Sequence, residues 1–310
     1  MSVFISYPTV FLWDRVFFLK NPNEHSIFLH GIDPGEVKII IKGLDVNKSS
    51  DIYGITPSLV KIGCEELTPF LTLLFNKTFT EGVFPQVLKY AKIVPIHKGD
   101  SKFLTSNYRP IALLPIFGKI LEKLMHSRIY RFICDNNILY KGQYGFQKGK
   151  STNQAIFDIQ EKITNSLEKG EKPCCIFLDL AKAFDTVDKD ILLHKLSHYG
   201  IRGKASEWLN SYLTDRKQSV HINGIGSTDM KIDTGVPQGS LLGPLLFLIY
   251  INDLVESSKV LQFVMFADDT CLFVSCKDTN SMQVILDQEL PKVHDWLVAN
   301  KLSLNVKKLT

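Results

Sequence analysis

The fold is decided by the stretch Phe263-Val264-Met265-Phe266-Ala267-Asp268-Asp269-Thr270-Cys271-Leu272-Phe273-Val274. Two apolar β-type runs flank two adjacent acids, and this layout predicts a hairpin with Asp268 and Asp269 at its tight turn. Two like charges held side by side repel each other, and partial burial increases the repulsion. Either a divalent cation that prefers oxygen ligands offsets this cost, or the pair is an ordinary Asp-Asp turn.

A third acid closes another apolar run, Cys175-Ile176-Phe177-Leu178-Asp179-Leu180. An acid at the end of a buried strand is costly unless it is paired or bound to a metal. If this strand neighbours the hairpin, Asp179, Asp268 and Asp269 converge. That is a ligand set for two-metal phosphoryl transfer, in which one ion activates a 3′-hydroxyl and the other stabilises the leaving pyrophosphate.

A glycine- and proline-rich loop is the third element, Gly235-Val236-Pro237-Gln238-Gly239-Ser240-Leu241-Leu242-Gly243-Pro244. Glycines allow a ligand to approach the backbone closely, and the amide of Gln238 both donates and accepts hydrogen bonds. On these residues alone, the loop either contacts a ligand or simply caps a buried helix.

Composition places the chain among globular proteins. It has 310 residues, 45% of them apolar and 22% charged, which excludes a disordered chain and fits two domains or one elaborated domain. The net charge is only +4, yet residues 86–131 hold nine basic and two acidic residues. This polarisation fits a polyanion-binding face beside a metal-binding face, or a solvated basic surface.

The six cysteines form no C-x-x-C pair, so we expect free thiols in a reducing compartment. The apolar start lacks a basic region and is interrupted by Asp14 and Arg15, and the run 241–251 is too short to cross a bilayer. We therefore expect a protein of the nucleus or cytoplasm that is neither secreted nor inserted in a membrane.

Periodicity predicts helices and strands that are mixed without strict alternation, which favours an α+β fold. Ser151 is expected to cap a helix that stops at Gly170, and a turn is expected at Asn223-Gly224. Helical patterns cover 36–44, 68–79, 117–132, 190–199, 204–213 and 281–298, and residues 237–254 are expected to form a loop that enters a buried helix. Strand patterns cover 174–180, 218–222, 260–267 and 270–274.

The three elements together resemble the reverse transcriptases of non-LTR retrotransposons of the LINE-like, jockey type. The matching motifs, in this order, are F-L-D-L-A-K-A-F-D, G-V-P-Q-G-S-x-L-G-P and F-A-D-D. Upstream, residues 91–100, 107–111, 143–146 and 149–152 are similar to finger motifs of the family, and residues 300–308 resemble the strand that closes its palm. The resemblance covers roughly residues 30–308.

This resemblance implies a right-hand polymerase: an unmatched leader over 1–30, fingers with N-terminal helices over 31–150, and a palm with the metal site over 151–310. The palm would be an antiparallel sheet backed by helices, with no thumb. It further implies a Mg²⁺- or Mn²⁺-dependent enzyme that extends a DNA primer on an RNA template with dNTPs. It does not identify which proteins, if any, are partners.

Site residues follow from the matched motifs. Asp179, Asp268 and Asp269 match the metal-binding and catalytic carboxylates, and Phe184 matches the gate that excludes a ribose 2′-hydroxyl. Gln238 matches the loop residue beside the incoming nucleotide. The nucleotide-binding set is completed by Lys98 and Arg109, which match basic residues near the triphosphate or contact the template backbone, and by Lys308, a candidate general acid to pyrophosphate.

Departures from the family pattern keep a second interpretation open. Gln147 stands where family members often carry Arg, and the sequence ends where a thumb would follow. A truncated, inactive retroelement remnant that at most binds RNA is therefore the alternative to an active polymerase. An RNA-templated RNA polymerase is a third, against which Phe184 argues.

Overall fold

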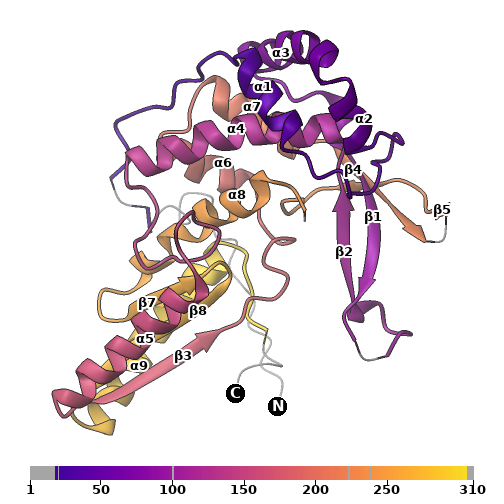
Figure 1. Ribbon diagram of the computed structural model, residues 1–310. Coiled ribbons are helices and arrows are strands. Elements are labelled where there is room, and N and C mark those ends of the chain that lie inside the picture. Colours follow the sequence, from indigo (N-terminus) through magenta and orange to yellow (C-terminus); the bar gives the residue numbers. More distant parts are fainter. Residues whose placement is uncertain (1–17, 20, 100, 223, 238, 306–310) are drawn as a thin grey trace. The chain divides into compact units, whose positions relative to one another are not determined.

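The computed structural model describes residues 18, 19, 21–99, 101–222, 224–237 and 239–305 (Figure 1). The chain divides into two compact units, and neither is continuous in sequence. One unit contains residues 138–195 and 247–305, and the other contains 23–137 and 196–246. Helices α6 (Lys189–His198) and α8 (Leu242–Ile251) each begin in one unit and end in the other.

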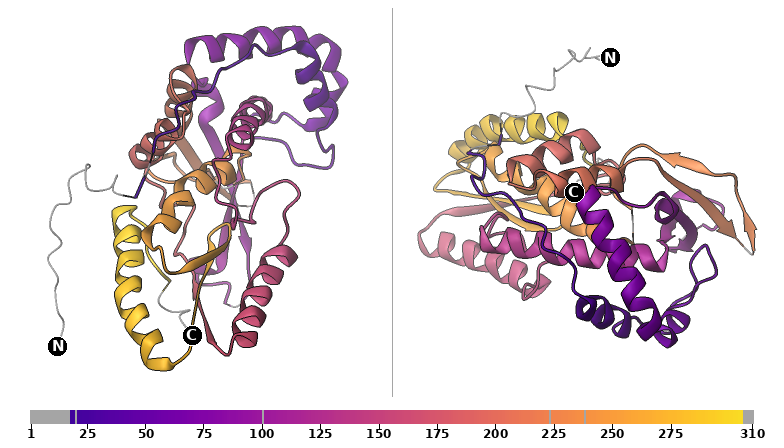
Figure 2. Two further views of the ribbon diagram at one scale, coloured as in Figure 1. Left: turned by 90° about the vertical axis from the view of Figure 1, so that its left-hand side faces the viewer. Right: turned by 90° about the horizontal axis from the view of Figure 1, so that it is seen from above.

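The first unit, 138–195 with 247–305, is built on a three-stranded antiparallel sheet in the order β3-β8-β7. Its strands are β3 (Lys172–Leu178), β7 (Gln262–Phe266) and β8 (Asp269–Cys276). Helices α5 (Thr152–Glu168) and α9 (Thr279–Ala299) lie on opposite sides of this sheet (Figure 2). The short helix η4 (Asn252–Ser257) packs against α9.

Local sequence explains where these helices begin. The hydroxyl of Ser151 accepts from the backbone N–H of Gln154, whose side chain accepts from the N–H of Ser151, a reciprocal cap that confirms the predicted start of α5. Asp278 caps α9, because its carboxylate accepts hydrogen bonds from both the backbone N–H and the hydroxyl of Ser281. Gly170 has φ +70° just past the end of α5, as a helix stop requires.

The second unit, 23–137 with 196–246, carries a five-stranded mixed sheet. Its path is β2-β1-β4-β5 with β6 also paired to β4, and β1 and β4 run parallel. The strands are β1 (Tyr90–His97), β2 (Tyr108–Leu113), β4 (Arg216–Ile222), β5 (Ile225–Gly226) and β6 (Met230–Ile232). The predicted turn at 223–224 falls between β4 and β5, where Gly224 has φ +84° and residue 223 lies outside the described residues.

Several helices lie wholly within this unit. They are α1 (Pro34–Lys42), α2 (Pro57–Ile62), α3 (Cys64–Glu81), α4 (Ile116–Asp135) and α7 (Lys204–Leu213), with short turns η2 (Gln86–Lys89) and η3 (Thr105–Asn107). Trp208 of α7 is fully buried and meets Phe79 and Phe84 edge to face. Helices α3 and α4 confirm the predicted helices at 68–79 and 117–132, and each extends beyond the predicted range at both ends.

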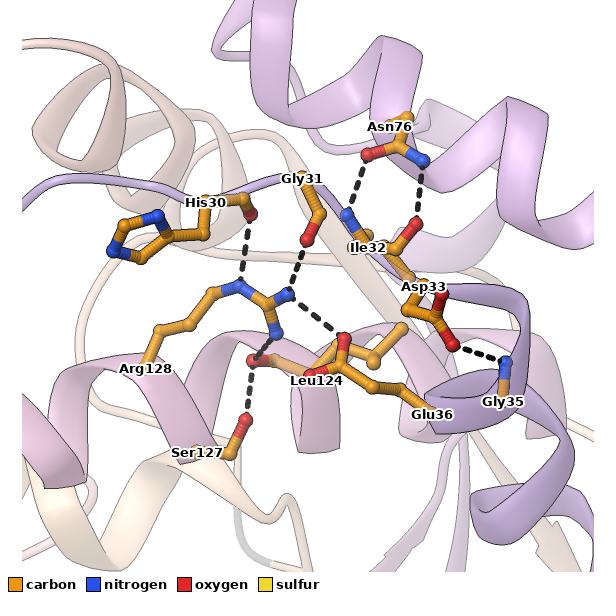
Figure 3. A network of polar contacts seen from close by, with 10 residues as sticks. All are labelled: His30, Gly31, Ile32, Asp33, Gly35, Glu36, Asn76, Leu124, Ser127 and Arg128. Atoms are coloured by element: carbon orange, nitrogen blue, oxygen red, sulfur yellow. Dashed lines mark hydrogen bonds and ion pairs between the residues drawn. The ribbon is translucent and has the colours of Figure 1, made fainter.

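One arginine fastens the segment before α1 to α4 (Figure 3). The guanidinium of Arg128 donates to the carbonyls of His30 and Gly31 and to the carboxylate of Glu36, 2.9 Å away. Beside it, the amide of Asn76 both donates to and accepts from the backbone of Ile32. These contacts satisfy backbone groups that no helix or strand would pair.

The mixed α+β prediction is confirmed. The fingers and palm assignment and the domain limits 1–30, 31–150 and 151–310 stay predictions. No helix in the described part of the chain is both long and apolar enough to cross a membrane.

Candidate active site

The hairpin of β7 and β8 holds two of the three predicted carboxylates. Phe266 and Asp269 form its last pair, so the turn consists of Ala267 and Asp268. The expected turn at Asp268 and Asp269 was thus wrong by one residue, because Asp269 already belongs to β8. Asp268 is half-buried and Asp269 is exposed.

The third carboxylate lies at the end of the neighbouring strand. Leu178 pairs with Thr270, and continuing this antiparallel register by one residue sets Asp179 level with Asp269. The carboxylate of Asp179 accepts a 3.0 Å hydrogen bond from the side-chain amide of Asn305. The backbone carbonyl of Asp179 also accepts a hydrogen bond from the backbone N–H of Asn305. The predicted neighbourhood of the two strands is confirmed.

The donor chemistry of this strand end suits Mg²⁺, since all three side chains offer hard oxygen ligands. The side chains nevertheless do not converge as placed. Among the described residues, no three His, Cys, Asp or Glu side chains are positioned to hold one metal ion. The backbone thus brings the three aspartates to one edge, and their side chains would have to rotate to share an ion.

A clamp holds the turn from the other side, and the sequence analysis did not assign it this role. The amide oxygen of Gln143, only 2% exposed, accepts from the N–H of Ala267 at 2.9 Å and from the N–H of Gly145 at 2.8 Å. A Cβ on Gly145 would lie 2.2 Å from the backbone nitrogen of Ala267. Ala267 has φ +58°, a left-handed conformation costly for a residue with a Cβ, so this clamp over-determines the turn.

Phe184 follows β3 in a series of turns. Its ring stacks on Phe247 with centroids 4.6 Å apart and meets Phe146 edge to face at 6.1 Å. Phe184 is half-buried, so part of its ring remains accessible. Two aromatic neighbours hold this side chain in place, which is what a steric gate would need.

A cleft of about 470 Å³ adjoins the carboxylates. Asp179 and Asp269 line it together with apolar side chains of α5, including Ile156 and Ile159. Phe177, 65% exposed, also faces this space. Asp179 and Asp269 therefore border a mainly apolar cleft in the same unit.

The predicted basic residues belong to the other unit. Lys98 directly follows β1, and Arg109 on β2 pairs with Ile96 of β1. Both side chains are exposed. Gln238 and Lys308 lie outside the described residues, so their assignments stay predictions.

The loop that carries Gln238 is anchored by a buried acid that the sequence analysis did not single out. Glu122 on α4, 1% exposed, accepts from the N–H of Leu241 at 2.7 Å and from the hydroxyl of Tyr212 at 3.1 Å. Burial raises the pKa of the Glu122 carboxyl, and the nearby guanidinium of Arg216 opposes this. Its only sequence signal is an acid within the apolar pattern of α4.

Comparison with known proteins decides the family. The pattern of the family described as reverse transcriptase (RNA-dependent DNA polymerase) matches residues 96–310. The chain belongs to the reverse transcriptases. The reverse transcriptase domain is of the non-LTR retrotransposon type, as predicted.

Relatives in Drosophila melanogaster support this assignment. The domain is 30% identical over 305 residues to the probable RNA-directed DNA polymerase from transposon BS, covering 94% of this chain and 33% of that protein. It is 28% identical to the RNA-directed DNA polymerase from mobile element jockey, covering 94% and 32%. It is 31% identical to the probable polymerase from the X-element, covering 77% and 27%. The domain spans about a third of the length of the relatives it matches.

Proposed function

We propose that this domain is the catalytic core of an RNA-directed DNA polymerase that adds dNTPs to a primer 3′-hydroxyl on an RNA template. The observation that carries the proposal is the meeting of Asp179 and the Asp268-Asp269 hairpin at one edge of a single sheet. In this proposal the unit with β3, β7 and β8 is the palm, and the unit with β1, β2 and β4 supplies the fingers.

Asp179, Asp268 and Asp269 would hold Mg²⁺ or Mn²⁺. When bound, the ions would lower the pKa of the primer hydroxyl and neutralise the charge that develops on the phosphates. Asn305 would orient the carboxylate of Asp179, because it contacts both the side chain and the carbonyl of that residue. The Gln143 clamp would fix the position of the turn that carries Asp268.

The remaining predicted residues take supporting roles. Phe184 would exclude ribonucleotides through its ring, and Lys98 and Arg109 would neutralise the triphosphate. Gln238 would contact the nucleotide, and Lys308 would donate a proton to pyrophosphate.

The second candidate function is an inactive remnant that binds RNA. The observation that favours it is the separation of the three carboxylate side chains, since no group of three in the described chain is ready to take an ion. The two candidates differ in metal binding and in nucleotide addition.

Primer extension on poly(rA)–oligo(dT) with dTTP and Mg²⁺ tests the proposal, with Asp268→Ala as the comparison. We expect the wild type to extend the primer and the variant not to. In an electron paramagnetic resonance titration, the wild type should bind Mn²⁺ more tightly than Asp268→Ala. A folded wild-type protein that neither extends the primer nor binds Mn²⁺ more tightly than Asp268→Ala would establish the remnant instead.

A further inference from the structure

The sheet of the second unit has one covered and one open face. Ala91, Ile93, Ala112 and Leu114 are buried together on the covered face. Side chains alternate along a strand, so the residues between them point to the other side. There Tyr90 pairs with Lys217, and Lys92 pairs with Ser219.

A cleft of about 270 Å³ lies on this open face. It is lined by Ile52, Tyr53, Tyr90, Ser219, His221, Gly226 and Ser227. Three of these side chains are aromatic rings, and the ring of Tyr53 is 48% exposed. The cleft therefore offers flat π-surfaces to the solvent.

Hydrogen bonds hold the rings in place. The hydroxyl of Tyr90 hydrogen-bonds the carboxylate of Asp229 and lies 3.0 Å from the hydroxyl oxygen of Ser219. That oxygen is in turn 2.8 Å from Nε2 of His221. The hydroxyl of Tyr53 donates to the carbonyl of Val87 at 2.6 Å. Rings fixed in this way lose little conformational entropy when a ligand stacks on them.

The backbone also leaves room for the His221 ring. Gly226 pairs with His221 across the β4–β5 hairpin, and a Cβ at Gly226 would lie 3.0 Å from Cε1 of that ring. The imidazole thus lies close over a residue without a side chain. This packing fixes its position beside Ser219.

Cations without ion-pair partners share the open face. Lys92 and Lys217 lie there, and Arg109 is on the same side because it pairs with Ile96. Within the described part of the chain none of the three forms an ion pair, whereas Lys231 on β6 lies within 4 Å of Asp215 and Asp233. An acidic ligand could therefore bind these cations without breaking an existing pair.

We propose that this cleft binds an unpaired base of the single-stranded RNA template, with Lys92 and Lys217 contacting the flanking phosphates. Aromatic rings beside cations on an open sheet are suited to single strands, because each base stacks and each phosphate is neutralised. The inference rests on the proposed function and deepens it, since it assigns the RNA to named residues of one unit.

Fluorescence anisotropy with a labelled oligo(U) RNA tests the site without requiring nucleotide addition. Tyr53→Ala and His221→Ala remove rings that are not part of the core, and Phe70→Ala removes a 73% exposed ring of α3 as the matched control. Loss of one stacking partner should weaken binding by about 5- to 100-fold. Phe70→Ala should bind as the wild type does.

Two further readouts localise the base. An oligonucleotide of abasic riboses should bind the wild type more weakly than oligo(U) does. Tyr53→Ala lacks a stacking ring, so it should bind the abasic oligonucleotide and oligo(U) with similar affinity. RNA carrying 5-iodouridine should cross-link on irradiation to a peptide that contains Tyr53, Tyr90 or His221. Lys217→Ala should reduce the salt dependence of binding, whereas Lys77→Ala on α3 should not.

The inference is overturned if the ring variants keep wild-type affinity, if cross-links map elsewhere, or if the folded domain binds no RNA. Its failure is separable from that of the proposed function. Ring-dependent binding without primer extension would retain the RNA site and reject the polymerase, and extension with unaltered binding in the variants would do the reverse.

Discussion

Replacing Gly145 by alanine should displace the Asp268 turn while leaving most of the fold intact. The new Cβ would lie 2.2 Å from the nitrogen of Ala267 and 2.9 Å from its Cα and Cβ. Ordinary contacts between such atoms are about 3.5–4.0 Å. The turn and the Gly145 backbone would therefore have to separate by more than ~1 Å. The clash cannot be relieved by a side-chain rotation, because the closest atoms belong to the backbone.

A displacement of this size predicts a large effect on the reaction and a smaller one on stability. Misplacing a reacting group by about 1 Å can cost about 100-fold in rate, and overpacking costs about 1–3 kcal/mol of unfolding free energy. Primer extension under saturating dTTP gives the rate, urea denaturation gives the stability, and Mn²⁺ titration reports the site directly.

Gly149→Ala is the matched control. It has φ +78° and nothing within 4 Å of an added Cβ, so it should lose about 1 kcal/mol to backbone strain and keep its rate and Mn²⁺ affinity. If Gly145→Ala fails to fold, Gln143→Leu tests the same clamp by removing its hydrogen bonds to Ala267. Wild-type rate and Mn²⁺ affinity in both clamp variants would refute the reasoning.

Two other predictions concern buried charges. Asp253→Asn leaves the ammonium of Lys195, 1% exposed and 2.5 Å from Asp253, without its counter-charge, and should lower the unfolding free energy by about 3–5 kcal/mol in urea denaturation. Glu81→Gln at the exposed Lys77 pair should change it little, and equal losses would contradict the assignment. Burial raises the pKa of Glu122 in the folded state, so the folded protein binds more protons than the unfolded one above about pH 4.3. That contribution to the free energy of unfolding is fully present below about pH 4.3 and is lost as pH rises through the folded pKa. The stability of Glu122→Gln should therefore decline less steeply over this window than that of the wild type, and parallel pH profiles would contradict this.

The sequence predicted the elements that carry the aspartates because their signals are local. Apolar runs, turn residues and the cap at Ser151 all act within a few positions, and β3, β7, β8 and α5 formed where these signals lie. The one-residue error at Asp269 has a physical reason. The two-residue hairpin turn holds Ala267 in a left-handed conformation, which its residue type disfavours and which the hydrogen bond to Gln143 supports.

The roles of Gln143 and Glu122 were not predicted because both residues contact partners that are distant in sequence. Gln143 reaches a residue far along the chain, and Glu122 finds its partners on α7 and beside the 235–240 loop. An acid among apolar residues signals burial only after its donors are known. The aromatic cleft likewise needed the β1–β4 pairing to bring Tyr90 and His221 together.

The interleaving of the two units in sequence has a consequence for synthesis on the ribosome. Strand β1 pairs with β4, and β3 pairs with β8, so each early strand must wait for a partner translated much later. Fragments ending at 137 or 195 would expose the unpaired edge of β1, and a fragment starting at 247 would expose that of β8. An unpaired edge can pair with a strand of another molecule, so fragments that expose one are prone to aggregate. Cutting this domain at its unit boundaries would therefore yield insoluble pieces, and circular permutation or loop insertion is the better route to dissect it.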